Sequence, residues 1–202
     1  MNFFHQAAFL KSAPSSRFLP PDEGIEVAFV GRSNAGKSTT LNRLTGRTIA
    51  RTSKTPGCTQ MINVFTLDET RRLIDLPGYG FAQVSIKTKQ TWQKSMQDYL
   101  QERQSLRGIV LIMDCRHPLK PLDIQMLEWA SSGQNLRIHV VLSKSDKISR
   151  LQLKSTLLQT TSFCQSLSDS ISVQTFSGLK KEGIETLVET LLSWYEVVPT
   201  IP

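Results

Sequence analysis

The chain has few cysteines and no long hydrophobic run. Cys58, Cys115 and Cys164 are three in number and widely spaced, which excludes a disulfide-rich framework and the usual spacings of a zinc site. The longest apolar runs, "GIVLIM" and "IHVVL", are too short to cross a bilayer. The N-terminus also lacks the basic segment that opens a signal peptide. We therefore expect a cytoplasmic protein with no membrane span.

The composition is that of a soluble globular protein with an excess of positive charge. The length of 202 residues favours one domain with a real core, and 39% hydrophobic with 20% charged residues fits this class. The net charge of +7 suits a polyanionic partner, but it is equally compatible with an ordinary basic soluble protein. At this point both interpretations stay open.

Strand-like and helix-like segments alternate from residue 25 to the end of the chain. Short, β-branched apolar runs are typical of buried strands, and longer segments with helical spacing lie between them. This alternation predicts a three-layer α/β fold with a mostly parallel sheet. We expect strands at 25–31, 61–67, 71–77, 108–114, 137–143 and 170–177, and helices at 37–46, 87–104, 121–133, 148–165 and 181–196.

The strongest motif is "GRSNAGKS" at residues 31–38, which matches the phosphate-binding pattern G-x-x-x-x-G-K-[ST]. It follows a predicted strand and opens a predicted helix, as a phosphate-binding loop (P-loop) requires. Gly31 and Gly36 let the backbone wrap a phosphate chain, towards which the loop N–H groups and the helix N-terminus point. Lys37 is expected to reach the β- and γ-phosphates, and the Ser38 hydroxyl to bind Mg²⁺.

Two further segments provide candidate ligands for the metal and the γ-phosphate. Asp75 ends an apolar strand, where its carboxylate can hold a Mg²⁺-bound water, and the N–H of Gly78 can meet the γ-phosphate. In the loop "SKTPGCTQ", Thr59 is the best candidate for a second hydroxyl ligand on a nucleotide-controlled segment. The alternative is that the loop threonines are only solvated. We predict catalytic roles for Lys37, Thr59 and Gly78.

The segment "LSKSD" at 142–146 decides which base is bound. It follows a buried strand on the side of the sheet where α/β folds bind ligands. The Asp146 carboxylate can accept hydrogen bonds from guanine N1–H and from its exocyclic amino group, which adenine lacks. The stem of Lys144 can lie along the ring face. In isolation, Asp146 would be better explained as a helix cap; downstream of a P-loop we interpret it as the guanine-reading residue.

Six stretches combine these motifs with more specific residue runs, and together they resemble the translation-factor-type GTPases. Within the TrmE-Era-EngA-EngB-Septin-like superfamily, the chain resembles the EngB family (YihA/YsxC) of bacterial ribosome-biogenesis GTP-binding proteins, from about residue 8 to 195. The stretches are "GRSNAGKST" at 31–39, "ARTSKTPGCTQMIN" at 50–63, "DLPGYGFAQV" at 75–84, "DCRHPLKPLD" at 114–123, "SKSDK" at 143–147 and "FSGLKKEG" at 176–183.

The resemblance implies a fold, a set of partners and a cellular role. The fold would be an α/β, Ras-like P-loop G domain at 25–198, between an N-terminal extension at 1–24 and a tail at 199–202. Its six-stranded, mostly parallel sheet would have one antiparallel edge strand and helices on both faces. The protein would be a monomeric GTPase that binds GTP or GDP and the large ribosomal subunit, through rRNA and ribosomal proteins. The family assists assembly of that subunit, and its loss is associated with defects in cell division and septation.

The resemblance also implies a set of nucleotide and metal contacts. Mg²⁺ would be held by Ser38 and Thr59, and by Asp75 through water. The nucleotide would contact Gly31, Arg32, Ser33, Asn34, Ala35, Gly36, Lys37, Ser38, Thr39, Gly57, Cys58, Thr59, Gln60, Met61, Asp75, Leu76, Pro77, Gly78, Ser143, Lys144, Ser145, Asp146, Phe176, Ser177 and Gly178.

Two positions depart from the family pattern. The base-reading motif begins with Ser143 where the family usually has threonine, which keeps the hydroxyl and removes a methyl. The last motif reads Ser177-Gly178 where the family usually has Ser-Ser. Because glycine is conformationally free, we expect Gly178 to loosen this loop and to weaken nucleotide binding.

The residue after Gly78 predicts slow hydrolysis. In Ras-type enzymes a glutamine at this position orients the attacking water, whereas this chain has Tyr79. We therefore expect a partner or a cation to complete catalysis. Asn34 suggests K⁺ as that cation, because its carbonyl could coordinate the ion near the phosphates; the alternative is an ordinary loop hydrogen bond.

Basic residues on nucleotide-controlled loops indicate a face for ribosomal RNA whose affinity depends on GTP. The alternative is that these charges are scattered and solvated. Two other functions stay open beside the ribosomal one, namely a metabolic P-loop kinase or ATPase and a nucleotide-bound scaffold at the division site. The basic residues are Arg47, Arg51, Lys54, Arg71, Arg72, Lys87 and Lys89.

Overall fold

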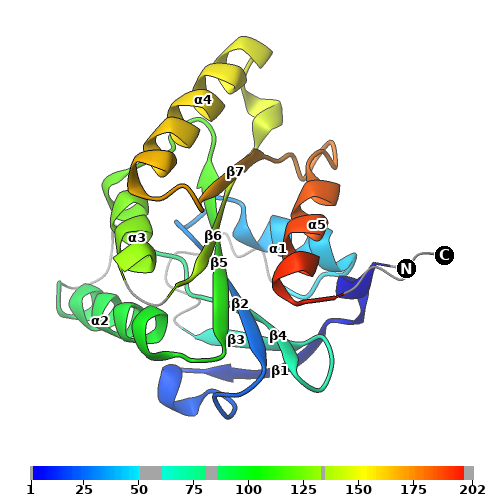
Figure 1. The fold of residues 1–202 in the computed structure, drawn as a ribbon, viewed down its shortest axis with the longest axis vertical. Helices are drawn as coiled ribbons and strands as arrows, with labels where there is room; N and C mark the ends of the chain where they lie inside the picture. Colours follow the sequence, from blue (N-terminus) through cyan, green and yellow to red (C-terminus); the bar gives the residue numbers. More distant parts are fainter. Residues whose placement is uncertain (1, 51–60, 81–85, 133–134, 198–202) are drawn as a thin grey trace.

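The computed structural model describes residues 2–50, 61–80, 86–132 and 135–197, with residues 86–92 described by their backbone alone. The described strands form one seven-stranded sheet in the order β1-β3-β4-β2-β5-β6-β7 (Figure 1). The elements are β1 (Ala8–Ala13), β2 (Ile25–Gly31), α1 (Lys37–Thr45), β3 (Ile62–Thr66), β4 (Arg71–Asp75), α2 (Ile86–Glu102), β5 (Leu106–Asp114), α3 (Pro121–Ser132), β6 (Arg137–Ser143), α4 (Arg150–Leu167), β7 (Ser172–Thr175) and α5 (Ile184–Trp194), with short 3₁₀ helices at Phe3–Gln6, Ser16–Phe18 and Ser145–Lys147.

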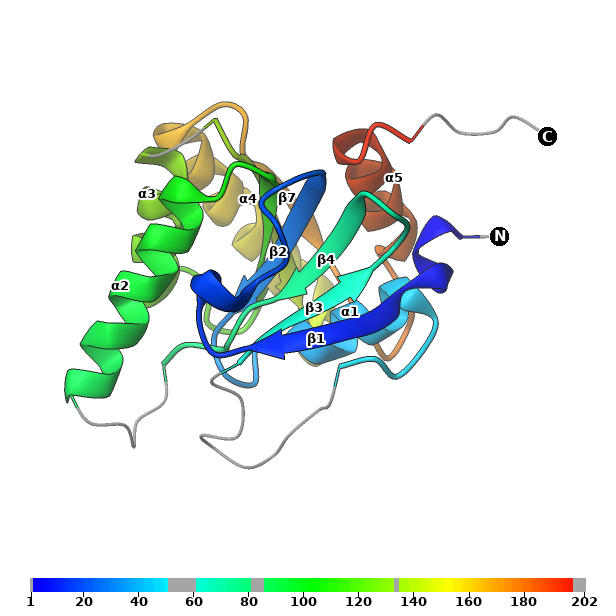
Figure 2. The ribbon, with the colours of Figure 1, turned by 90° about the horizontal axis from the view of Figure 1, so that it is seen from below.

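Helices cover both faces of the sheet, as predicted for a three-layer fold. Helices α2, α3 and α4 lie on one face, and α1 and α5 on the other (Figure 2). Each face has its own hydrophobic core: Tyr99, Leu127 and Cys164 pack on the first, and Leu41 and Leu191 on the second. The predicted helices and strands all occur, with boundaries that differ by a few residues.

The predicted number of strands was wrong, because the N-terminal segment adds a seventh. Strand β1 pairs antiparallel with β3, which itself pairs antiparallel with β4. β3 is therefore the one described strand that runs against the others, and it lies inside the edge formed by β1. Five of the six side chains of β1 are exposed. Its sequence, AFLKSA, does not alternate between apolar and polar residues as a half-buried strand does, so the pattern did not predict a strand. Only its pairing with β3 defines it.

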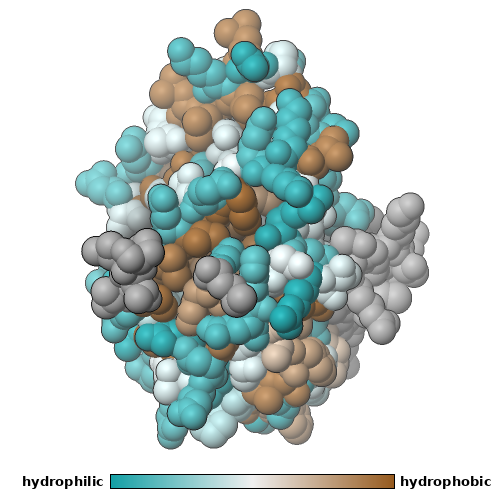
Figure 3. All heavy atoms as spheres, turned by 90° about the vertical axis from the view of Figure 1, so that its right-hand side faces the viewer, coloured by the Kyte–Doolittle hydropathy of each residue, from teal (hydrophilic) through white to brown (hydrophobic). Residues whose placement is uncertain are grey.

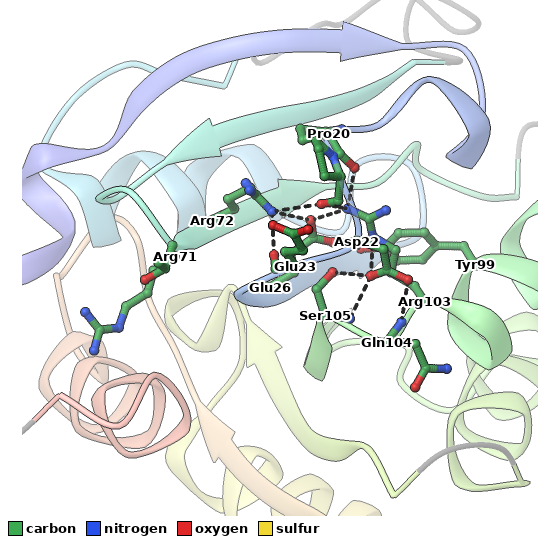
Figure 4. Close-up of polar contacts among 12 residues, drawn as sticks. Pro20, Asp22, Glu23, Glu26, Arg71, Arg72, Tyr99, Arg103, Gln104 and Ser105 are labelled. Atoms are coloured by element: carbon green, nitrogen blue, oxygen red, sulfur yellow. Dashed lines mark hydrogen bonds and ion pairs between the residues drawn. The ribbon is translucent and has the colours of Figure 1, made fainter.

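One of the arginines assigned to an RNA face, Arg72, has an internal role instead. Arg72 donates to the carboxylate of Glu26 and to the carbonyl of Glu23, and its side chain is nearly buried (Figure 4). Arg71 pairs with Asp68 and donates to the Tyr195 carbonyl. The charge of Arg72 is thus neutralised inside the protein, so this part of the prediction was wrong. The Arg71 side chain stays 27% exposed, and its place on an RNA face stays a prediction.

A buried histidine makes the stability of this fold dependent on pH. Burial lowers the pKa of His139 against the opposing effect of its hydrogen bond with Gln174, and the ring also contacts the Ser172 hydroxyl at 2.7 Å. The unfolded chain, with a histidine pKa of about 6.5, therefore binds more protons at mildly acidic pH. This contribution to stability is complete above that value and is lost as the pH falls through the lower pKa of the folded state.

We expect urea unfolding to show a lower free energy of unfolding at pH 5.5 than at pH 7.5, with His139 as a main cause. The His139→Gln variant keeps a polar side chain but cannot titrate, so its pH dependence should be smaller than that of the wild type. His117→Gln, on an exposed residue, is the matched control. An unchanged pH dependence in His139→Gln would contradict the prediction.

Candidate functional site

The predicted P-loop has the geometry of an anion-binding turn. It connects the carboxyl end of β2 to α1, and Gly36 caps the helix at φ 103°, a left-handed conformation that favours glycine. An added Cβ at Gly36 would also lie 3.1 Å from the Ser143 hydroxyl. The N-terminus of α1 therefore presents free backbone N–H groups at the carboxyl edge of the sheet.

The P-loop lysine and the aspartate that ends β4 meet in front of this turn. Lys37 Nζ forms an ion pair with Asp75, whose side chain is almost buried. Asp75 is held from the other side by Asn63 of β3, which is its partner in the sheet register and donates from Nδ2 at 3.4 Å. Lys37, predicted to bind the phosphates, and Asp75, predicted to hold a metal-bound water, are thus in direct contact.

The segment that contains Gly78 is fastened to the P-loop by its backbone. The Ser33 N–H donates to the Tyr79 carbonyl at 2.8 Å, and the Tyr79 N–H donates to the Gly31 carbonyl at 3.2 Å. The position of Gly78 is therefore fixed relative to the phosphate-binding turn. The contact of the Gly78 N–H with a terminal phosphate stays a prediction.

The side chain of Tyr79 is turned into the protein. Its hydroxyl donates to Asp123 Oδ1 at 2.7 Å, and the Lys120 N–H donates to Oδ2 of the same carboxylate at 3.0 Å. Burial and the carboxylate together raise the pKa of Tyr79 well above its ordinary value. Burial likewise raises the pKa of Asp123, and the hydrogen bonds only partly offset this effect. This tyrosine ties the segment to α3 and is not placed to do the work of a water-orienting glutamine.

The base-reading segment is attached to the P-loop at two points. The Ser143 hydroxyl donates to the Ala35 carbonyl, and Lys144 Nζ donates to the Asn34 carbonyl at 2.6 Å. Lys144 also pairs with Asp114 at 3.0 Å. The missing methyl at Ser143 therefore leaves the hydroxyl contact intact. The Asn34 main-chain carbonyl makes a loop hydrogen bond with Lys144, and the K⁺ site stays a prediction.

The carboxylate of Asp146 is oriented by a neighbouring loop. The Ser177 hydroxyl donates to Asp146 Oδ1 at 2.7 Å, and this hydrogen bond is the main cause that lowers the pKa of the carboxyl. The other oxygen, Oδ2, is buried and accepts no hydrogen bond from any residue that the structure describes. Lys147 Nζ lies 3.2 Å away as an ion pair, but its side chain is half exposed. An exposed ammonium contributes little to a carboxylate oxygen, and an ionised carboxylate has room for further donors, so a ligand can still pair with Oδ2.

The loop at 176–178 is anchored on both sides. The Phe176 N–H donates to the Leu142 carbonyl at 2.8 Å, and the Phe176 carbonyl accepts from the Ser145 N–H at 3.1 Å. Arg43 of α1 donates from Nε to the Gly178 carbonyl at 2.8 Å. Gly178 is buried and its carbonyl is held by Arg43. The expected effect of Gly178 on nucleotide affinity stays a prediction.

Known proteins resemble this chain along almost its whole length. Residues 26–144 match the model of the family described as "50S ribosome-binding GTPase". The "probable GTP-binding protein EngB" of Tolumonas auensis is 52% identical over 194 residues, which are 96% of this chain and 91% of that protein. The chain belongs to the EngB family of GTP-binding proteins. The EngB protein of an Enterobacter species is 50% identical over 95% of this chain and 92% of its own length.

A solved structure supports the fold of this EngB chain. A crystal structure of a "probable GTP-binding protein engB" superimposes with a TM-score of 0.69, covering 85% of this chain and 98% of that one, at 21% identity. The predicted G-domain fold is thereby confirmed. Among the described residues, no helix is long and apolar enough to cross a membrane. On the face seen in Figure 3, hydrophilic and hydrophobic residues are interspersed.

The structure brings most of the predicted EngB site residues to one edge of the sheet, but with different roles. Ala35, Leu76 and Phe176 bury their side chains in the two cores, so only their backbone can face a nucleotide. Met61 lies just before β3. Among the predicted contacts, Gly57, Cys58, Thr59 and Gln60 lie outside the described residues, as do the basic residues Arg51 and Lys54 and the side chains of Lys87 and Lys89.

Three residues beside the site were not assigned from the sequence. Asp114 pairs with Lys144, and Asn63 and Arg43 hold Asp75 and Gly178. Burial would raise the pKa of Asp114, but hydrogen bonds from Arg116 and Lys144 outweigh it and hold the pKa well below its ordinary value. Of these three residues, only Asp114 could have been recognised from the sequence, because it ends an apolar run as Asp75 does. The roles of Asn63 and Arg43 depend on sheet register and helix orientation.

Proposed function

We propose that this EngB protein binds GTP with Mg²⁺ at the site between the P-loop, Asp75 and the base-reading loops, and hydrolyses it slowly. We further propose that it acts as a cytoplasmic monomer whose nucleotide state controls binding to the large ribosomal subunit during assembly. Normal cell division and septation would then depend on it through the supply of ribosomes.

The observation that carries the site assignment is the carboxylate of Asp146, whose Oδ1 accepts from Ser177 and whose Oδ2 has only the exposed ammonium of Lys147 nearby, at 3.2 Å. Guanine presents two adjacent donors, N1–H and the exocyclic amino group, and a carboxylate can accept both. Because Ser177 occupies Oδ1, the carboxylate is held in one orientation with Oδ2 available. Adenine offers no N1 proton and would leave this atom unpaired, which explains a preference for GTP.

The phosphates would be held by the N-terminal end of α1 and by Lys37. In this structure Lys37 neutralises Asp75, and a bound triphosphate would compete for the same ammonium group. Transfer of Lys37 to the phosphates would release Asp75 to accept a hydrogen bond from a metal-bound water. Binding of the phosphates by Lys37 would thus free the negative charge of Asp75 for the hydrated metal ion.

The residues present fit Mg²⁺ bound largely by nucleotide and water. No group of three or more histidine, cysteine or acidic residues among the described residues forms a metal cage, and Mg²⁺ in nucleotide sites uses few protein ligands. Ser38 and Asp75 stand at the required edge, and Thr59 would complete the set. When bound, Mg²⁺ would neutralise charge on the β- and γ-phosphates.

Hydrolysis by this site alone would be slow. Tyr79 replaces the water-orienting glutamine, and its hydroxyl is engaged by the buried Asp123. Completion of catalysis would therefore fall to a ribosomal partner or to K⁺. Faster turnover in K⁺ than in Na⁺ buffer would support the cation.

A ribosomal role rests on family membership and on charge. The matched domain family is described by its binding to the 50S ribosome, and the chain carries a net charge of +7. A basic protein gains affinity for RNA by releasing counterions from phosphates, so its binding should weaken as salt is raised. Arg72 is excluded from the proposed RNA face, because its charge is neutralised by the buried Glu26.

Two measurements test the proposal. Competition of GTP and ATP against fluorescent GDP should show a strong preference for GTP; equal competition would contradict the base assignment. Co-sedimentation with large ribosomal subunits should depend on whether GDP or a non-hydrolysable GTP analogue is bound, and should decrease between about 50 and 200 mM salt. Nucleotide-independent or absent binding would contradict the switch and favour a scaffold role at the division site.

A further inference from the structure

Helix α1 contacts the loop at 176–178 through two side chains that share one helix face. Thr39 and Arg43 are four residues apart, a spacing that places them side by side. The Arg43 guanidinium donates to the Gly178 carbonyl, and the Thr39 methyl group lies against the Gly178 backbone. The base-reading loop therefore rests on the helix whose first turn carries the phosphate and metal ligands.

The place of a side chain at position 178 is already occupied. A Cβ added to Gly178 would lie closer than 3.0 Å to Cγ2 of Thr39, whereas its next neighbours, Phe176 Cε1 and Thr39 Cβ, would be at 3.6 and 3.7 Å. Contacts at the latter distances are ordinary, so the conflict is with one methyl group. Gly178 also does not have a positive φ, so backbone freedom is not the reason for glycine here.

We infer that Thr39 and Gly178 are a complementary pair, in which the threonine methyl fills the space of a residue-178 side chain and sets the height of the guanine-contacting loop above α1. Arg43 fixes the same loop through its carbonyl. This inference rests on the proposed function, because it assigns these residues to positioning of the base site. Thr39 directly follows Ser38, so the pair also connects the metal end of the site to the base end.

The pair predicts a specific pattern in a double-mutant cycle. Gly178→Ser alone should weaken GDP binding by about tenfold, because overpacking against the methyl group displaces the loop. Thr39→Ser removes only that methyl and keeps the hydroxyl. In the Thr39→Ser background, Gly178→Ser should therefore cost much less, and the double variant should bind GDP more tightly than Gly178→Ser.

The measurements are dissociation constants for GDP and, by competition, for inorganic tripolyphosphate with Mg²⁺, on all four proteins. A displaced 176–178 loop should raise the dissociation constant for GDP and leave that for tripolyphosphate unchanged. Thermal unfolding without nucleotide will show whether each variant is folded. Arg43→Gln should also weaken GDP binding, by about threefold to tenfold, with Arg150→Gln on exposed α4 as its charge-matched control.

The outcomes separate this inference from the proposed function. If the wild type binds neither GDP nor GTP, the proposed function fails. If the wild type binds but Gly178→Ser has the same cost in the wild-type and Thr39→Ser backgrounds, or no cost in either, the pair is wrong and the proposed function stands. A parallel loss of tripolyphosphate binding would mean that the clash moves α1, and would also overturn the inference.

Discussion

Replacement of Asp146 by asparagine is expected to turn a site for guanine into one that prefers xanthine. The Ser177 hydroxyl donates to Oδ1, so an asparagine would keep its oxygen there and place its amide nitrogen where Oδ2 now lies. That nitrogen would face the amino group of guanine, donor against donor, whereas xanthine presents a carbonyl. We expect GTP affinity to fall by about 1,000-fold and XTP to become the better ligand.

Competition of GTP, XTP and ATP against fluorescent nucleotides measures this change. Asp169→Asn removes one charge from an exposed position and serves as the matched control. If Asp146→Asn lost all nucleotides equally while it remained folded, the carboxylate would be structural. If it kept its GTP affinity, another residue would read the base.

Replacement of Glu26 by glutamine is expected to lower the free energy of unfolding by several kcal/mol. Glu26 is fully buried at the start of β2, where its carboxylate accepts from Arg103 at 2.7 and 3.0 Å and from Arg72 at 3.3 Å (Figure 4). The Tyr99 hydroxyl also contacts it, at 3.4 Å. Removal of the anion leaves the nearly buried Arg72 without its acidic partner and Arg103 with only Asp22, 3.3 Å from its Nε. Loss of the buried anion should cost about 3 kcal/mol of unfolding free energy.

Urea unfolding of Glu26→Gln would give this value, and Glu23→Gln is the control. Glu23 lies in the same segment, but its side chain is exposed and its contact with Arg72 uses the backbone carbonyl. The cluster lies at the amino ends of the strands, opposite the nucleotide site. We therefore expect GDP affinity to be unchanged in whatever fraction is folded. A stability loss below about 1 kcal/mol would contradict the prediction, because an exposed ion pair contributes that little.

The chemistry of the site could be predicted because it depends on short, local patterns. The P-loop needs glycine, lysine and serine at set spacing between a strand and a helix, and the eight consecutive residues 31–38 provide that arrangement. Asp75 and Asp146 follow apolar strands, so their position at the carboxyl edge of the sheet follows from topology alone. None of these inferences required knowledge of a distant side chain.

The errors came where a residue's role depends on a partner far away in sequence. Strand β1 is exposed along most of its length and is defined only by its pairing with β3. Arg72 has the same kind of explanation, because its charge is neutralised by the buried Glu26. The role inferred for Gly178 likewise depends on a distant side chain, that of Thr39. The residues adjacent in sequence to an arginine or a glycine do not indicate which distant side chain it will contact.

Short residue patterns are enough to identify this chain as an EngB-type G domain, because nucleotide-binding folds repeat the same local motifs. How those motifs hold one another follows only from the folded chain: Ser143 and Lys144 on the P-loop backbone, Tyr79 on Asp123, and Gly178 on Thr39. These contacts depend on close packing between elements, and packing is a property of distances that are set only when the chain folds.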